Sequence, residues 1–460
     1  MKRREMAALA EELSDYALSI DYRDLGDEVV LEAKKRVIDS IGCAIGAFRE
    51  LPVRAARRTV AEDHPGKSST VLGTRVKTSP DMATFVNGAM VRYFDFNDTY
   101  LSKEPGHPSD NISACLAAAE KEGSSGKDLL TSIALAYEIQ CRLCDAADIR
   151  HRGWDHVCYG LVSSALASGR LMGLSREQLT HAVNISLNAH IAMRQVRAGE
   201  LSAWKGCSFA NAARNAVFSA MLARNGMTGP APIFEGEMGF FKQVSGPFEL
   251  ETEKFGGRGG SFKLVETYVK YFPAEYHAQS AIWAALAARR RVRSIDDIES
   301  VEVETHEAGL TILGKDTEKW TPATKETADH SLPYVVGMAI LKGRIDNSTY
   351  SPRNLRDGKT LEFLKKITVT EDEEFTRAYP GHVANRVSLK LKGGGTVTEE
   401  VDVPKGHPKN AMTKEEVESK FRRLTARFLS DSQSEKVLEF VWNLEMQREI
   451  DPLLRLCVVA

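Results

Sequence analysis

Side chains that can transfer protons are concentrated in one polar segment, YFDFNDTYLSKEPGHPSDN, at residues 93–111. Asp95, Thr99 and His107 lie there among turn-forming residues, between two stretches with helical periodicity. Loops held by rigid elements are where catalytic and binding residues tend to gather. An imidazole close to a carboxylate is suited to general acid–base chemistry, so this segment is the first candidate site.

Two other interpretations of residues 93–111 stay open. Asp98, Ser109 and Asp110 belong to the residue types that cap helices and form turns, so their role can be purely structural. Two aspartates and one histidine can also bind a divalent ion. The segment contains neither an H-x-x-x-H nor a D-x-D-x-D-G pattern, and we therefore predict no metal.

Histidines and cations recur in three later segments, each close to the start of a helical stretch. These are His156 in HRGWDHVCYG, Arg194 and Lys205 in RQVRAGELSAWKGCSFANAAR, and Lys270 and His277 in KYFPAEYHAQSA. A cation at a helix N-terminus is electrostatically unfavourable unless an anion joins it. Lys205 therefore indicates a carboxylate or phosphate ligand, although a solvated lysine would fit the same sequence.

The elements that position the first of these residues are helices. Up to about Asn225, apolar residues recur at three- and four-residue steps. In DEVVLEAKKRVIDSIGCAIGAF, residues 27–48, they form a single stripe that indicates a core-facing helix. Ser175 and Gln178 have the spacing of a capping box. Residues 1–20 have the pattern of an amphipathic helix, and the first half of the chain is predicted to be a helix bundle.

The pattern changes at residues 228–246, where glycine and proline cluster and helical periodicity stops, so we expect a linker or domain boundary there. Alternating apolar and polar residues then predict a small sheet, with strands in ESVEVETH and KKITVT and a hairpin in RVSLKLKGGGTVTEEVDV. We expect the hairpin to turn at Gly393 to Gly395. Thr413 and Glu416 form a second capping-box pattern, and helical periodicity returns beyond them.

Composition excludes several classes of function. With 61 Lys and Arg against 63 Asp and Glu, the net charge of -2 provides no overall field for nucleic acid or an anionic membrane. A chain of 460 residues favours two domains. No stretch of about 18 apolar residues occurs, and the start does not resemble a signal peptide, so the expected compartment is the cytoplasm.

Signals for cofactors and redox chemistry are also lacking. The sequence has no G-x-G-x-x-G after a strand and no P-loop, so a nucleotide cofactor is not expected. Its seven cysteines are dispersed through apolar stretches, which favours reduced thiols. Cys141 and Cys144 form a C-x-x-C pattern, but the mid-helix setting and the lack of a second pair argue against a zinc site.

Five segments together resemble the MmgE/PrpD family: DFNDTYLSKEPGHPSDN, WKGCSFANAAR, YFPAEYHAQSAIWAAL, THEAGLTI and KETADHSLPYVVGMAIL. They follow the family's order over nearly the whole chain, and the first and third are especially similar to its dehydratase branch. The resemblance implies a mainly α fold, with an all-helical bundle domain at residues 1–265 that residues 410–460 complete. It also implies an inserted, smaller α+β lid domain at residues 266–409 and a homodimer.

The activity implied by this resemblance is that of a hydro-lyase. It would dehydrate a hydroxy-tricarboxylate, 2-methylcitrate to 2-methylaconitate or citrate to cis-aconitate, without a cofactor. Such a reaction needs a base, an acid on the departing oxygen and fixed cations around the developing charge. We predict catalytic roles for Asp95, His107, His156 and Lys205, and substrate binding by Thr99, Arg194, Lys270 and His277.

Other functions stay open. A cis-aconitate decarboxylase or an amino-dicarboxylate epimerase of the same fold would use similar cations and bases. Where the decarboxylase has an active-site tyrosine, this chain has Trp320 within EKWTPATKE, which argues against decarboxylation. From another class, the chain could be a non-catalytic helical scaffold, and the gathering of His, Lys and Asp residues on loops argues against that alternative.

Overall fold

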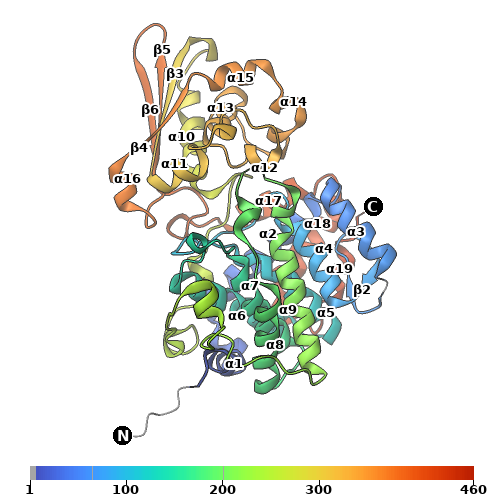
Figure 1. The fold of residues 1–460 in the computed structure, drawn as a ribbon. Coiled ribbons are helices and arrows are strands. Elements are labelled where there is room, and N and C mark those ends of the chain that lie inside the picture. Colours follow the sequence, from blue (N-terminus) through green and yellow to red (C-terminus); the bar gives the residue numbers. More distant parts are fainter. Residues whose placement is uncertain (1–6, 65, 200, 460) are drawn as a thin grey trace.

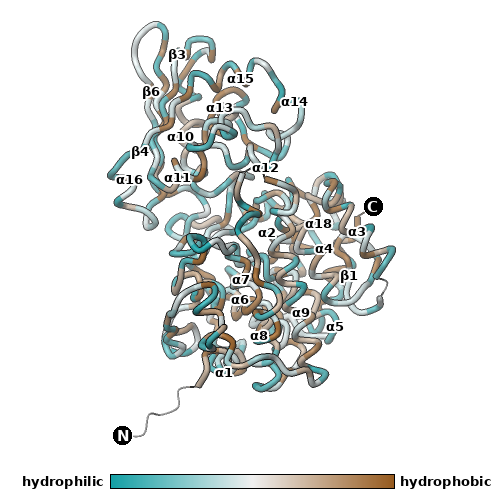
Figure 2. Tube along the Cα trace, in the orientation of Figure 1, coloured by the Kyte–Doolittle hydropathy of each residue, from teal (hydrophilic) through white to brown (hydrophobic). Residues whose placement is uncertain are grey.

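The computed structural model describes residues 7–64, 66–199 and 201–459, and its apolar side chains form two large hydrophobic cores. We call the parts of the chain around them the helical unit (residues 7–271 and 406–459) and the sheet unit (residues 272–405). Figure 1 shows the sheet unit as a separate lobe above the helices. In Figure 2 hydrophobic segments run through the interior of both lobes.

Helices build the first part of the helical unit, as predicted. They are α1 (Leu9–Ser19), α2 (Gly26–Gly46), α3 (Leu51–Asp63), α4 (Pro80–Arg92), α5 (Ile112–Glu122), α6 (Gly126–Ala146), α7 (Val157–Leu171), α8 (Arg176–His190) and α9 (Ser208–Arg224). The capping box at Ser175 and Gln178 is confirmed at the start of α8. The short strands β1 (Ser69–Thr70) and β2 (Lys77–Thr78) pair beside them. Residues 1–6 of the predicted N-terminal helix lie outside the described residues.

The C-terminal helices return to the helical unit (Figure 1). They are α17 (Lys414–Thr425), α18 (Asp431–Trp442) and α19 (Asp451–Leu456). The predicted capping box at Thr413 begins α17. A Cβ on Gly42 of α2 would lie 3.2 Å from the ring of Phe421, and one on Gly46 would lie 3.3 Å from Leu424. These two glycines therefore allow α17 to approach α2 closely.

The sheet unit contains a four-stranded mixed sheet in the order β4-β3-β5-β6. Its strands are β3 (Ile298–Thr305), β4 (Ile367–Glu371), β5 (Asn385–Leu391) and β6 (Thr396–Val401). β3 runs parallel to β4 and antiparallel to β5. The predicted strands and hairpin are confirmed, and the hairpin turns at Gly394 and Gly395, which both have positive φ.

Helices pack on this sheet and complete its core. They are α10 (Gln279–Arg290), α11 (Glu307–Leu313), α12 (Lys325–Ala328), α13 (Leu332–Lys342), α14 (Pro352–Leu355), α15 (Gly358–Leu364) and α16 (Glu373–Ala378). α10 contacts β5, β6 and α13. Val301 and Val303 of β3 are buried in this core, whereas Glu302 between them is exposed. The alternation that predicted the strand therefore separates a core face from a solvent face.

Residues 228–246, where the sequence predicts a linker or domain boundary, belong to the helical unit instead. Phe234 and Phe240 from this segment are buried in the larger core. The glycines and prolines end the helical periodicity, but the aromatic side chains between them still pack on the helices. The smaller core begins later, at Phe272, although Tyr276 and Val383 of the sheet unit still pack in the larger core.

The chain passes between the two units twice, and the two passages lie side by side. The backbone N–H of Val269 donates to the carbonyl oxygen of Gly406 at 2.9 Å.

All seven cysteines are buried free thiols, as predicted from their dispersion. None of the helices within residues 7–459 that the structure describes has the length and hydropathy of a membrane span.

Candidate active site

A cavity of about 390 Å³ is lined by side chains from both units. All eight site residues predicted from the sequence line it: Asp95, Thr99, His107, His156, Arg194, Lys205, Lys270 and His277. Eight further charged or imidazole side chains were not selected from the sequence and also line it: Arg92, Glu104, Arg150, Arg197, Glu275, Asp316, Lys319 and His330. Segments far apart in the chain therefore converge on one space.

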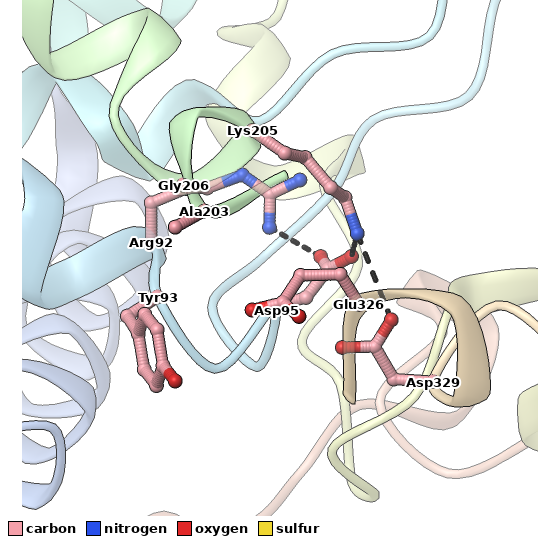
Figure 3. A pocket seen from close by; sticks show the side chains of 8 residues that line it. All are labelled: Arg92, Tyr93, Asp95, Ala203, Lys205, Gly206, Glu326 and Asp329. Carbon is pink, nitrogen blue, oxygen red and sulfur yellow. Dashed lines mark hydrogen bonds and ion pairs between the residues drawn. The ribbon is translucent and has the colours of Figure 1, made fainter. Parts of the chain in front are cut away.

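Asp95 is the centre of the charged network, just beyond the end of α4. Its carboxylate lies 2.5 Å from Lys270 Nζ. It also lies 3.1 Å from Lys205 Nζ and pairs with Arg92 (Figure 3). Burial opposes ionisation, but Arg92, Lys270 and Lys205 hold the pKa of Asp95 well below its usual range. Among the described residues other than glycine, only Asp95 has a positive φ, 51°. These ion pairs hold the unusual backbone conformation.

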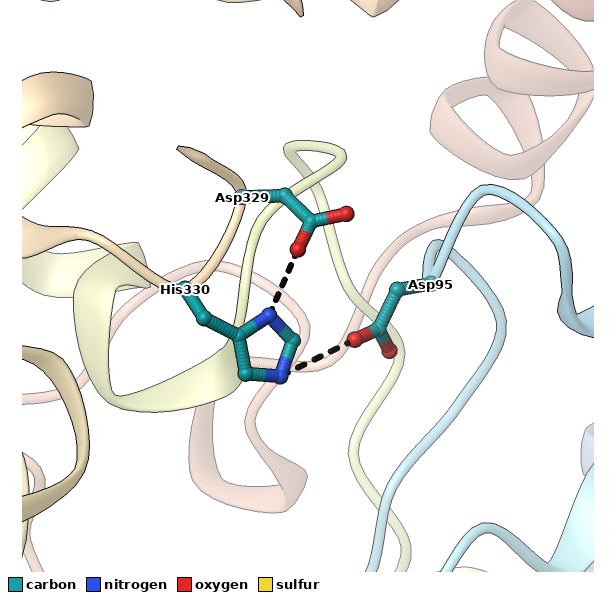
Figure 4. A group of neighbouring side chains, drawn as sticks. All are labelled: Asp95, Asp329 and His330. Atoms are coloured by element: carbon teal, nitrogen blue, oxygen red, sulfur yellow. Dashed lines mark hydrogen bonds and ion pairs between the residues drawn. The ribbon is translucent and has the colours of Figure 1, made fainter. Parts of the chain in front are cut away.

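His330 of the sheet unit contacts the same carboxylate. Its Nε2 lies 3.3 Å from Asp95 Oδ2, and its Nδ1 lies 2.6 Å from Asp329 Oδ1 (Figure 4). Lys205 Nζ is 3.6 Å from Asp329 Oδ1. Burial, together with the charge of Lys205, lowers the pKa of His330. Lys205 therefore joins carboxylates of the helical and sheet units.

Asp95, Asp329 and His330 form the one group in the described part of the chain whose donor atoms lie close enough for a shared metal ion. Each carboxylate, however, already contacts ammonium groups: Lys205 and Lys270 at Asp95, and Lys205 and Lys325 at Asp329. A divalent cation placed there would face these charges at contact distance. The neighbouring lysines therefore argue against a metal ion bound by these three residues.

His107 is held between a guanidinium and a backbone carbonyl. Arg92 Nη2 donates to His107 Nε2 at 2.8 Å, and His107 Nδ1 donates to the carbonyl of Asp98 at 2.7 Å. A guanidinium can only donate, so Nε2 is the unprotonated nitrogen. Burial, followed by the charge of Arg92, lowers the pKa of His107 well below its ordinary value. The imidazole is therefore neutral at neutral pH.

His156 repeats this arrangement on the neighbouring wall. Arg197 Nη2 donates to His156 Nε2 at 2.9 Å, and Arg197 Nε donates to Asp155 at 2.8 Å. Nδ1 of His156 is buried and has no hydrogen-bond partner in the described structure. Burial and the charge of Arg197 lower the pKa of His156 to about 3. Its ring centroid is 5.6 Å from that of His107, so two neutral imidazoles lie side by side.

His277 lines the cavity from the sheet unit. Its Nδ1 lies 2.9 Å from Glu275 Oε1, and its Nε2 lies 3.1 Å from the hydroxyl of Tyr379. Burial works against ionisation of Glu275, but His277 outweighs it and lowers the pKa of Glu275 to about 2. The carboxylate thus fixes the orientation of this imidazole.

Thr99 and Arg194 differ in whether their side chains have hydrogen-bond partners within the protein. The hydroxyl of Thr99 donates to the carbonyl of Gly106 at 3.0 Å, and its backbone pairs with Tyr268 at 2.8 Å in both directions. The guanidinium of Arg194 has no ion-pair or hydrogen-bond partner among the residues described, and burial lowers its pKa. Arg194 is therefore free to bind an anion in the cavity.

Glu104 is a buried carboxyl group in the same wall. Its Oε2 accepts hydrogen bonds from the backbone N–H groups of Ile149 at 2.9 Å and Arg150 at 2.8 Å. Its Oε1 has no partner in the part of the chain that is described. Burial raises the pKa of Glu104 to about 7, with a smaller contribution from Asp148, while Arg194 lowers it.

Two domains of one known protein family match successive parts of the chain, and both parts contribute residues to the cavity. The MmgE/PrpD N-terminal domain matches residues 11–253, and the MmgE/PrpD C-terminal domain matches residues 272–446. The chain belongs to the MmgE/PrpD family. The resemblance seen in the five sequence segments is thereby confirmed.

Relatives of this MmgE/PrpD chain include several 2-methylcitrate dehydratases. That of Escherichia coli (strain K12) is 30% identical over 430 residues, which cover 88% of this chain and 87% of the relative. That of Cupriavidus necator is 30% identical over 437 residues, 88% of each chain. The mitochondrial 2-methylcitrate dehydratase of Yarrowia lipolytica is 28% identical over 477 residues, which cover 96% of this chain and 89% of the relative.

Trp320 does not line the cavity in this MmgE/PrpD chain. Its indole N–H donates to the carbonyl of Gly314 at 3.0 Å, within the sheet unit. Lys319, the residue before it, lines the cavity instead. Trp320, which stands where the decarboxylase has its active-site tyrosine, therefore contributes no side chain to the cavity wall.

The roles of Asp98 and Asp110 fit the structural interpretation. Asp98 Oδ1 accepts a hydrogen bond from the backbone N–H of Ser109 at 2.9 Å, and its Oδ2 accepts one from Tyr137 at 2.6 Å. Asp110 accepts a hydrogen bond from Asn97 at 2.7 Å. Both carboxylates therefore stabilise the loop that presents the cavity residues.

A lysine of the C-terminal helix α17 supports this loop from behind. Lys420 Nζ donates to the carbonyl oxygens of Phe96 at 2.7 Å and Lys270 at 2.8 Å, and it lies 2.6 Å from Asp39 Oδ1. Lys420 is buried, so these contacts are shielded from solvent. The C-terminal helices thereby fix the backbone next to Asp95.

Proposed function

We propose that this MmgE/PrpD protein is a hydro-lyase that dehydrates a hydroxy-tricarboxylate, 2-methylcitrate to 2-methylaconitate or citrate to cis-aconitate. The observation that carries the proposal is the cavity wall, where cations from both units surround two imidazoles that burial and guanidinium groups keep neutral. The name 2-methylcitrate dehydratase, borne by the relatives, supports the same substrate class.

Substrate carboxylates are assigned to Lys205, Lys270 and Arg194. Asp95 pairs with both lysines, so an incoming carboxylate competes with Asp95 for them. Arg194 has no such internal competitor among the described residues. Charge-assisted hydrogen bonds to these cations are stronger than neutral ones, and together they fix the orientation of the substrate.

Proton removal is assigned to His107. Its Nε2 lone pair faces Arg92, so the base becomes available when Arg92 turns toward a substrate carboxylate. The carbon–hydrogen bond beside a carboxylate breaks and its electron pair forms the double bond, while the bond from the next carbon to its hydroxyl breaks. Lys205 and Lys270 stabilise the negative charge that develops on the carboxylate.

The departing hydroxyl is assigned to His156. Because Arg197 donates to Nε2, the proton of this imidazole is on Nδ1, the nitrogen without a partner in the described structure. Its N–H donates a hydrogen bond to the departing oxygen. The proton taken by His107 and the hydroxide that leaves together account for the one water released, so the scheme needs no metal.

Replacing His107 with Asn tests the assignment of the base. We expect His107→Asn to lower kcat by about 10²- to 10⁴-fold, because a positioned proton acceptor is lost, with little change in melting temperature. The assay follows the absorbance of the conjugated alkene formed from 2-methylcitrate and from citrate. His151→Asn is the matched control, because the side chain of His151 is 76% exposed.

Three outcomes would contradict this function or its mechanism. Near-wild-type turnover by His107→Asn would reject His107 as the base. Release of carbon dioxide, or a change of configuration alone, would favour the decarboxylase or epimerase alternative. Activity that a chelator abolished and a divalent ion restored would contradict the metal-free scheme.

We also propose that the sheet unit acts as a lid and that the protein is a homodimer. Support for the lid comes from contacts across the junction: Lys205 lies 3.6 Å from Asp329, and Lys325 donates to the carbonyl of Tyr93 at 3.3 Å. Opening the lid would break these contacts and expose the cavity. The homodimer rests on the family resemblance, and the molar mass from light scattering tests it.

A further inference from the structure

Lys319 is a buried cation that the assignments above do not use. It ends a short helical turn, Thr317–Lys319, in the sheet unit, and only 8% of its surface is exposed. It lines the cavity, and its ammonium has no ion-pair or hydrogen-bond partner within the described residues. The two other lysines of the cavity differ in this respect, because Lys205 and Lys270 both pair with Asp95.

The surroundings of Lys319 make this lack of a partner costly. Burial disfavours its charged form, and the nearby charge of Lys205 adds to that effect, so the pKa of Lys319 is lowered. Asp316, Asp329 and Glu275 act in the opposite direction, but their effects do not outweigh burial and Lys205. Buried charges in proteins are normally paired. Two ammonium groups that face one cavity therefore indicate an anion that is bound during function.

The backbone around Lys319 is fixed, so its position in the cavity wall is not incidental. Ser331 Oγ donates to the carbonyl oxygen of Lys319 and also accepts from the backbone N–H of Tyr334, at the start of α13. Trp320 is held by its bond to Gly314. This anchoring presents the lysine side chain toward the helical unit from a rigid part of the sheet unit.

We propose that Lys319 binds a carboxylate of the substrate together with Lys205. This inference rests on the proposed function, because it takes the ligand to be a polycarboxylate. The two lysines come from different units, so a carboxylate between them joins the sheet unit to the helical unit. Lys319 is thus a substrate-binding residue, and its contribution adds to those of Lys270 and Arg194.

Direct binding of a tricarboxylate that cannot react tests this inference. Propane-1,2,3-tricarboxylate has no hydroxyl to lose, so calorimetry measures its Kd without turnover. We expect Lys319→Met to raise that Kd by about 10- to 100-fold, the usual effect of losing a hydrogen bond to a charged group. Lys319→Arg keeps the charge and should bind within several-fold of wild type. Lys390→Met is the control, because the Lys390 side chain on β5 is 61% exposed.

Melting temperatures without ligand separate binding from a structural role. Removing an unpaired buried charge should leave Lys319→Met at least as stable as wild type. An unchanged Kd, or a melting temperature several degrees below wild type, would overturn the inference and leave the proposed function intact. If wild type bound no propane-1,2,3-tricarboxylate and formed no product from 2-methylcitrate or citrate, the proposed function would fail and the inference with it.

Discussion

Asp95 supplies negative charge to a cavity wall that is rich in cations. Three cations contact it, and it lies at the point where substrate carboxylates are proposed to bind. A cavity with three uncompensated cations would be costly to fold, since buried charges without partners are strongly unfavourable. The internal carboxylate therefore stabilises the unliganded protein, and an incoming polyanion takes over its role.

Glu104 gives a prediction for the pH dependence of stability. Its pKa is 4.5 in the unfolded chain and about 7 in the folded one, so the folded state holds a proton that the unfolded state has lost. The contribution of protonated Glu104 to the free energy of unfolding is fully present below about pH 4.5. It is lost as the pH rises through 7, and the loss amounts to about 3 kcal/mol. Glu104→Gln should therefore gain stability relative to wild type as the pH rises.

Urea unfolding at a series of pH values measures this difference. Glu362→Gln is the control, because the side chain of Glu362 is 72% exposed. Its unfolding free energy should follow that of wild type at every pH. A constant difference between Glu104→Gln and wild type from pH 4 to pH 8 would show that Glu104 is ionised in the folded protein.

Sequence reasoning found the cavity residues that stand in polar loops. Asp95, His107 and Lys205 could be predicted from the sequence, because in polar loops residue types that can do chemistry occur beside turn-forming residues. Arg92 and His330 were not selected, although His330 lies in a segment used for the family resemblance. The contact of His330 with Asp95 and that of Arg92 with His107 join residues that are distant in the sequence, so no local pattern contains them.

At the scale of elements, the helix α17 is a structural part of the site. Lys420→Met should destabilise the protein by about 3–5 kcal/mol, because Asp39 then remains buried without its counter-charge. The double variant Asp39→Leu/Lys420→Met should recover most of that stability. Its kcat should stay low, because the carbonyl oxygens of Phe96 and Lys270 still lack their donor.

Urea unfolding and steady-state kinetics on the two single variants and the double variant measure both effects. The stability changes should be non-additive, as expected for side chains in contact. Wild-type turnover by the double variant would show that Lys420 does not position the site. Additive stability changes would show that the ion pair with Asp39 is not coupled.

Elements with a strong local signal could be predicted from the sequence. The capping boxes at Ser175 and Thr413 and the hairpin at Gly394 are examples, because each depends on interactions within a few residues. The segment at residues 228–246 shows the opposite case. Its place in the larger core is decided by aromatic side chains such as Phe234 that pack on distant helices.

At the scale of the whole molecule, we propose that the two cores correspond to two folding domains, with the lid domain close to residues 266–409. The hydrogen bond between Val269 and Gly406 holds the two passages of the chain together. A protein in which a short glycine-rich linker replaces residues 272–405 should therefore unfold cooperatively on heating. It should lack activity, because His277 and His330 are removed.

Circular dichroism melts and the dispersion of amide resonances in NMR spectra test this prediction. A broad, non-cooperative transition would show that the helical unit needs the sheet unit to fold. The intact protein is the reference for the shape of the transition. The family resemblance indicated this two-part organisation, whereas composition alone gave only the number of domains expected from length.

The position of Lys420 near the C-terminus matters during biosynthesis. α17 leaves the ribosome only after the whole sheet unit has been made. Until then the surface of α2 around Gly42 and Gly46 is not covered by α17, and the nascent bundle exposes it to solvent or to chaperones. The carbonyl oxygens of Phe96 and Lys270 beside the cavity therefore gain their donor Lys420 only after both units have been synthesised.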